Sequence, residues 1–198
     1  MILPGHCRGF TMIEILVSIL IMTLGLLGLA GLQVRAQQAE LESYQRAQAL
    51  ILAQDMIDRI NANRKAGGCY NFTTDTTDGA PFAGSGAASA PVCGPHGTTE
   101  TRARADLDLT EWHNTLNGAA EQLAGNQVGA MIGARGCVSL DSSVTPNVYR
   151  VSVAWQGMSK TRSPTLVDAA LTCATDQYGD EAQRRVVSLT FPIACLNC

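Results

Sequence analysis

The chain has 198 residues and a formal net charge of −3, with 16% charged and 46% hydrophobic residues. This mild acidity, with its basic residues scattered along the chain, excludes the positive surface by which proteins bind DNA or RNA. The length leaves about 160 residues beyond the apolar segment near the N-terminus, enough for one domain.

Residues 10–32 form an apolar segment long enough to cross a membrane. Its only polar or charged side chains are Thr11, Glu14, Ser18 and Thr23. A helix of this length spans roughly 34 Å, about the thickness of a bilayer core. Glu14 is the anomaly, because a carboxylate at membrane depth costs roughly 2.5–3.5 kcal/mol and usually has a partner.

Two ordinary interpretations fit this segment less well. A secretory signal has a shorter apolar region with its cleavage site after it, whereas here the small residue Gly9 precedes the run. A plain single-pass anchor agrees with the hydropathy, but it gives no reason for Gly9, Phe10 and Glu14 at these spacings.

Gly9, Phe10 and Glu14 resemble the class III signal of type IV prepilins and pseudopilins, residue by residue. The resemblance implies that prepilin peptidase cuts after Gly9, that the new N-terminal Phe10 is N-methylated, and that Glu14 acts in assembly. Residues 1–9 are then a removed leader. Loss of Arg8 changes the formal net charge from −3 to −4.

The chemistry of the processed end suggests a role for Glu14. Cleavage leaves a mostly protonated amine on Phe10, in the same apolar setting as the Glu14 carboxylate. Glu14 can neutralise this amine within one chain, at helical i, i+4 spacing, or in a neighbouring subunit. The resemblance favours the neighbouring subunit, where the pair would set axial register.

The membrane segment contains three glycines spaced three residues apart, Gly25, Gly28 and Gly31. Glycine weakens a helix by about 1 kcal/mol relative to Ala and permits close approach of another helix. Helix packing in the membrane and local melting during assembly are both open as the reason for these glycines.

Residues 33–66 continue the same helix in amphipathic form, since no Pro or Gly interrupts the run until Gly67-Gly68. An irregular apolar stripe favours packing on the chain's own head over a free coiled coil. The stripe consists of Leu41, Tyr44, Ala47, Leu50, Ile57 and Ile60.

Residues 67–100 are rich in Gly, Ser, Thr, Ala and Pro, and we expect a connecting loop with almost nothing to bury. Residues 101–198 form the expected globular head. It begins with a weakly patterned helix over 101–123 and continues with strands within 128–140, 148–156 and 185–193, the last two by their alternation. The predicted fold class is α+β, with the long N-terminal helix packed on a C-terminal antiparallel sheet, which is also the pilin architecture.

Seven cysteines occur, and six remain once Cys7 leaves with the leader. An even number in an exported head indicates disulfides in an oxidising compartment, here the periplasmic side of a bacterial envelope. Six cysteines permit 15 pairings. We expect these three pairs: Cys69–Cys93, Cys137–Cys173 and Cys195–Cys198.

No sequence motif indicates a catalytic site, a cofactor or a metal site. The final CLNC has the spacing of a redox or half-zinc motif, but no thioredoxin-like pattern and no second CxxC accompany it. His96 and His113 lack metal-ligand spacing, and we expect both to be structural or exposed. No GxSxG, P-loop or HExxH motif is present in the sequence.

Four stretches resemble PilV-type minor pilins, the type IV pilus modification proteins: NRKAGG, GARGCVSL, YRVSVAWQG and YGDEAQRRVVSLT. This resemblance implies a low-abundance subunit that initiates pilus assembly near the tip. Its implied partners are prepilin peptidase, the other minor pilins, the major pilin, a tip adhesin, and inner-membrane lipid before assembly. The implied location is the inner membrane, with the leader cytoplasmic and the head periplasmic, and then the pilus.

Two alternatives from other settings stay open. A minor pseudopilin of a type II secretion system has the same N-terminus, and gene context separates it from a pilus subunit. A membrane-anchored periplasmic binding domain would only mimic the signal and would keep residues 1–9.

Overall fold

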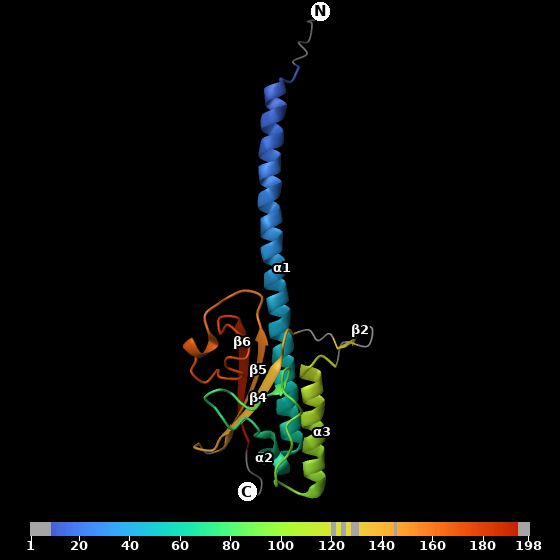
Figure 1. The fold of residues 1–198 in the computed structure, drawn as a ribbon, viewed down its shortest axis with the longest axis vertical. Helices are drawn as coiled ribbons and strands as arrows, with labels where there is room; N and C mark the ends of the chain where they lie inside the picture. The colour runs from blue at the N-terminus through green and yellow to red at the C-terminus, as the bar shows by residue number, and fades with distance from the viewer. Residues whose placement is uncertain (1–8, 120–121, 124–125, 128–130, 145, 194–198) are drawn as a thin grey trace, which may run out of the picture. The chain divides into compact units, whose positions relative to one another are not determined.

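The computed structural model describes residues 9–119, 122–123, 126–127, 131–144 and 146–193. The chain divides into two units, Met1–Leu41 and Glu42–Cys198, and helix α1 (Met12–Ala62) contributes to both. In the second unit, α1 residues and helix α3 (Thr99–Leu116) pack with a four-stranded antiparallel sheet (Figure 1). The predicted α+β, pilin-like fold is confirmed.

The sheet has the strand order β1-β4-β5-β6, and every pair in it is antiparallel. Its strands are β1 (Ala83–Gly84), β4 (Arg135–Asp141), β5 (Val148–Gln156) and β6 (Arg184–Pro192). The alternation of β5 sends Val151, Val153 and Trp155 into the core that contains α1 and α3. The opposite face carries a smaller cluster around Cys137, Cys173 and Tyr178.

The apolar stripe predicted for α1 is only partly the buried one. Ile57 and Ile60 lie in the core as expected, whereas Leu41, Tyr44 and Leu50 are exposed. The buried positions at the N-terminal end of the packed segment are Gln45, Ala49 and Ala53, one helical turn apart. Two of these, Ala49 and Ala53, are small side chains within the core, so side-chain volume as well as hydrophobicity determines which face of the helix is buried there.

Helix α1 ends at Ala62 and is followed by a 3₁₀ turn (Arg64–Ala66) and the short helix α2 (Gly67–Tyr70). Asn63 marks the change, because its N–H lies within bonding distance of the carbonyls of both Arg59 and Ile60. Its side chain donates to the Tyr70 hydroxyl at 3.2 Å and to the Thr101 carbonyl at 2.8 Å. These side-chain bonds turn the chain back toward the head.

The segment 67–100 is more ordered than a connecting loop. It contains α2 and strand β1, and its Tyr70, Phe72 and Ala83 are buried in the core. The expectation that it has almost nothing to bury is therefore wrong. The buried side chains of this segment follow no helical or strand period, so the sequence pattern does not predict them.

Helix α3 begins with a capping box between Thr98 and Thr101 and ends at Leu116, short of the predicted end at residue 123. Gly118 has a φ of +90°, a conformation that terminates helices. Beyond it, strands β2 (Gln122–Leu123) and β3 (Asn126–Gln127) form a separate two-stranded sheet. The β4 strand starts at Arg135, and residues 128–130 of the predicted strand lie outside the described residues.

Candidate processing and assembly site

The N-terminal unit places Gly9 and Phe10 ahead of the helix. Phe10 is 80% exposed, and the Thr11 carbonyl accepts the first helical bonds from the N–H groups of Glu14 and Ile15. The peptide bond after Gly9 therefore lies in non-helical, exposed chain, as a protease substrate requires. Since α1 begins at Met12, Phe10 and Glu14 do not share a helix face in this precursor chain.

Glu14 lies in the first turn of α1, where the helix dipole favours an acid. Its carbonyl accepts a bond from the Ser18 hydroxyl at 2.7 Å. Its carboxylate forms no ion pair within residues 9–119 or the other described ranges. The first turn thus carries an acid without an ion-pair partner among the described residues.

Helix α1 is long and apolar enough to cross a membrane, by length and composition, and its apolar window has no buried residues. At Gly25, Gly28 and Gly31, an added Cβ would meet no atom within 4 Å. Contacts within the described part of the chain therefore give no reason for the three glycines.

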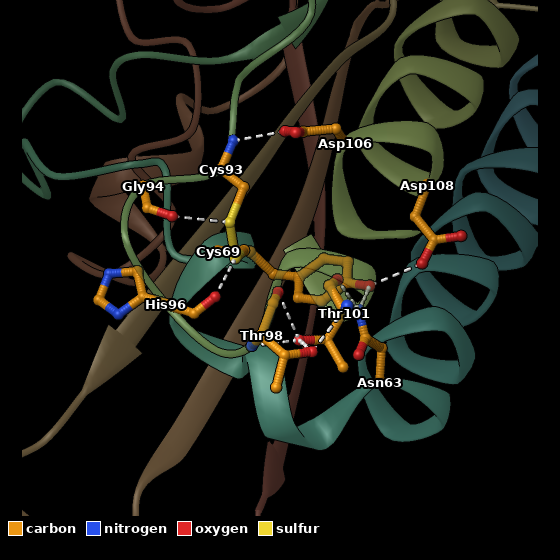
Figure 2. The surroundings of a disulfide bond; sticks show 10 residues. Asn63, Cys69, Cys93, Gly94, His96, Thr98, Thr101, Asp106 and Asp108 are labelled. Atoms are coloured by element: carbon orange, nitrogen blue, oxygen red, sulfur yellow. Dashed lines mark hydrogen bonds between the residues drawn. A yellow bond between two sulfur atoms is a disulfide. The ribbon is translucent and has the colours of Figure 1, made fainter. Parts of the chain in front are cut away.

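The head contains two disulfides that tie its loops to regular elements. One joins Cys69 of α2 to Cys93, and the Cys93 N–H donates to the Asp106 carboxylate of α3 at 2.7 Å (Figure 2). The other joins Cys137 of β4 to Cys173 in the segment before β6. These are two of the pairs that the sequence led us to expect, and Cys195–Cys198 lies outside the described residues.

A buried polar network connects α1, α2 and α3. Asp108, which is 1% exposed, accepts a bond from the Tyr70 hydroxyl at 2.6 Å. Arg59 of α1 lies 3.4 Å from the same carboxylate, and Arg104 lies 3.0 Å from it. No sequence pattern predicts this network, because its partners Tyr70 and Asp108 lie 38 positions apart in sequence.

Two further cationic side chains organise the sheet face opposite α1. Arg135 stacks on the rings of Tyr178 and Phe82, at 4.4 and 5.3 Å from their centroids. Arg184 is fully buried and pairs with Glu181 while donating to the carbonyls of Leu171 and Cys173. Both hold the loops around the Cys137–Cys173 disulfide. Burial raises the pKa of Tyr178 to about 12, so its hydroxyl stays protonated.

The two histidines of the head have structural surroundings. His113 Nδ1 accepts a hydrogen bond from the Gly84 N–H at 3.0 Å, which joins α3 to β1. Burial lowers the pKa of His113, so the ring is neutral at pH 7 and able to accept. The His96 ring lies against Gly68. Within the described residues, no three His, Cys, Asp or Glu side chains gather as metal ligands would.

Two family models match the chain in consecutive segments. Residues 5–30 match the prokaryotic N-terminal methylation motif, and residues 31–110 match the Tt1218-like family, described as type IV pilin Tt1218. The chain is a type IV pilin. No curated protein and no solved structure matches it.

The methylation motif of this pilin includes Gly9, Phe10 and Glu14, and it implies processing by prepilin peptidase. Type IV pilins are structural subunits and not enzymes, which agrees with the prediction from sequence. An apolar N-terminal helix that lies first in the inner membrane and then in the pilus is typical of them.

Proposed function

We propose that this pilin is a PilV-type minor pilin that helps to initiate pilus assembly and lies at or near the tip. The single observation that most strongly supports a filament subunit is the spacing of Gly9, Phe10 and Glu14 within a matched methylation motif. The four PilV-like stretches, which extend from the end of the long helix to the last strand, support the subtype.

In this proposal, residues 1–9 are removed and residues 10–32 form the membrane and filament-core helix. The same helix continues to Ala62, and residues 63–198 form the connecting region and the periplasmic head. The partners are prepilin peptidase, other minor pilins, the major pilin and a tip adhesin.

We propose that Glu14 pairs with the Phe10 amine of a neighbouring subunit. The exposed Glu14 carboxylate, which has no ion-pair partner among the described residues, supports this role. Open space at Gly25, Gly28 and Gly31 supports close packing or loosening of the helix among other subunits.

The Glu14→Val variant tests the proposal. Membrane insertion should be unchanged or slightly more efficient, because an apolar residue has a lower free energy of insertion at this depth than a carboxylate. Incorporation into pili should fall sharply, since the partner amine is left charged and unpaired in an apolar filament core. The measurement is the ratio of protein in sheared pili to protein in membranes, with methylation checked by mass.

Thr23→Val is the matched control, since it removes another polar group of the same segment, whose hydroxyl bonds only to the Leu20 carbonyl. It should enter pili at the wild-type ratio. A wild-type ratio for Glu14→Val would refute the register role. If deletion of the protein abolishes secretion and leaves piliation intact, the pseudopilin alternative holds instead.

A further inference from the structure

Strand β6 forms one edge of the sheet, with β5 as its only neighbouring strand in the described part of the chain. Hydrogen bonds at the two ends of this pair show which backbone groups face β5. The Gly157 N–H donates to the Gln183 carbonyl at 2.8 Å, and the Ile193 N–H donates to the Asn147 carbonyl at 3.0 Å. The register between these two ends is continuous. The odd-numbered residues of β6 therefore form the backbone hydrogen bonds to β5.

Even-numbered residues of β6 consequently turn their N–H and C=O groups away from β5. Val186, Ser188 and Thr190 present three donors and three acceptors along this edge. No hydrogen bond to these six groups occurs among the residues that the structure describes. A row of unpaired backbone groups is a template for another strand.

The opposite edge of the sheet offers no such row. Strand β1 consists of Ala83 and Gly84 alone, and the Gly84 N–H is already bonded to His113. Ala83 is fully buried. The nine-residue β6 is therefore the long open edge of this sheet.

A shallow apolar pocket of about 440 Å³ adjoins the C-terminal end of the β6 edge. Exposed Thr190 belongs both to the edge and to the wall of the pocket. The other lining residues are Val144, Pro146, Val148, Phe191 and Pro192. Peptides added to a sheet edge gain specificity from pockets of this kind, which accept alternate side chains.

We propose that the β6 edge accepts an extended strand from a different pilus subunit, with an apolar side chain of that strand in the Thr190 pocket. The inference rests on the proposed function as a pilus subunit. Only an extended chain matches outward donors and acceptors that repeat every second residue.

A second copy of this chain is the less suitable occupant. Subunits of a filament are related by a screw operation, so the edge of one meets a different surface of the next. Two β6 edges would face each other only across a two-fold axis, which such a filament lacks.

Hydrogen exchange of individual amides tests the proposal, with the mature full-length protein in detergent compared with the same protein in sheared pili. The amides of Ser188 and Thr190 should exchange freely in detergent and at least about tenfold more slowly in pili. The amides of Val187 and Leu189, which bond to β5, serve as internal controls and should be protected in both samples.

Thr190→Pro supplies an independent arm. Proline removes one outward N–H and no bond to β5, as is tolerated on an edge strand. The ratio of pilus to membrane protein should fall about tenfold, the effect of losing about 1.4 kcal/mol of pairing. Thr110→Ala, at an exposed position of α3 that belongs neither to the edge nor to the pocket, should retain the wild-type ratio. Unchanged protection of Val187 and Leu189 shows that the variants fold.

Each outcome has one meaning. Free exchange of Ser188 and Thr190 in pili that contain the protein overturns the β6 proposal and leaves the pilus role intact. Slow exchange already in detergent also overturns it, because the edge is then covered within its own chain. Absence of the wild-type protein from pili overturns the proposed function and this inference together.

Discussion

Tyr70 donates its hydroxyl to Asp108 at 2.6 Å, and both side chains are essentially inaccessible to solvent. The bond joins the short helix after α1 to the middle of α3. Burial and the bond to Asp108 both raise the pKa of Tyr70, so the tyrosine remains the donor at any physiological pH. The Asp108 carboxylate is thus held between a neutral donor and the guanidinium groups of Arg59 and Arg104.

The Tyr70→Phe variant should destabilise the head by about 1.5–3 kcal/mol, because it leaves a buried carboxylate oxygen without its donor. Urea unfolding of the detergent-solubilised protein measures this change. Tyr44→Phe is the matched control, since Tyr44 is 48% exposed and its loss of a hydroxyl should change stability by less than about 0.5 kcal/mol. Equal stability of the two variants would contradict a structural role for the bond.

His113 makes the head sensitive to mild acid. Burial lowers its pKa in the folded state below the ordinary value of 6.5. Its contribution to stability is therefore fully present above pH 6.5 and is lost as the pH falls through the folded-state pKa. Protonated Nδ1 can no longer accept the bond from Gly84.

The free energy of unfolding, measured between pH 7 and pH 5, should fall less steeply for His113→Gln than for the wild type. The variant loses the Gly84 bond at every pH, so it starts from a lower stability at pH 7. Asn114→Gln, which changes an exposed residue of the same helix and removes no titrating group, is the control and should keep the wild-type slope. Parallel profiles for His113→Gln and wild type would argue against this titration.

Gly136 permits a close approach between α3 and the sheet. A Cβ built at this position would lie 2.4 Å or less from two ring atoms of Trp112. We expect Gly136→Ala to lower stability by about 1–3 kcal/mol through overpacking. At Gly94 the nearest atom to an added Cβ is 3.6 Å away, so Gly94→Ala should have little effect on the same thermal or urea unfolding curve.

The disulfides should be detectable by peptide mapping without reduction. We expect Cys69–Cys93 and Cys137–Cys173, as in the structure, together with the proposed third pair Cys195–Cys198. Replacing both Cys137 and Cys173 by Ser should cost about 3–4 kcal/mol in the chain-entropy treatment. Six free thiols or a stoichiometric bound metal would rule out this framework.

Processing at the N-terminus is tested by peptide mass spectrometry of membrane material. The mature chain should begin at Phe10 and carry one added methyl group, and Gly9→Val should block cleavage by replacing the small residue. Ala at the same position is the milder control, because it stays small. A wild-type protein that retains residues 1–9 would mean that the segment is a plain anchor.

The sequence by itself determined the features that depend on local chemistry. The long apolar run predicts a helix, because a single segment that crosses a bilayer must satisfy its backbone hydrogen bonds internally. The spacing of Gly9, Phe10 and Glu14 is read from neighbouring residues. The alternation in β5 is likewise local, and its predicted bounds, 148–156, agree with the structure. The predicted helix stop at Gly67-Gly68 is wrong, because α1 already ends at Ala62 and the two glycines begin α2.

Only the tertiary structure decided which surfaces meet. Ala49 and Ala53 are buried in the core whereas the larger Leu50 is exposed, because the fit depends on the volume of the opposing surface. Tyr70 is hydrogen-bonded to Asp108, 38 positions away in sequence, and His113 to Gly84, 29 positions away. No short-range sequence pattern predicts such pairs. The open edge of β6 is of the same kind, because an edge is defined by the strands that surround it.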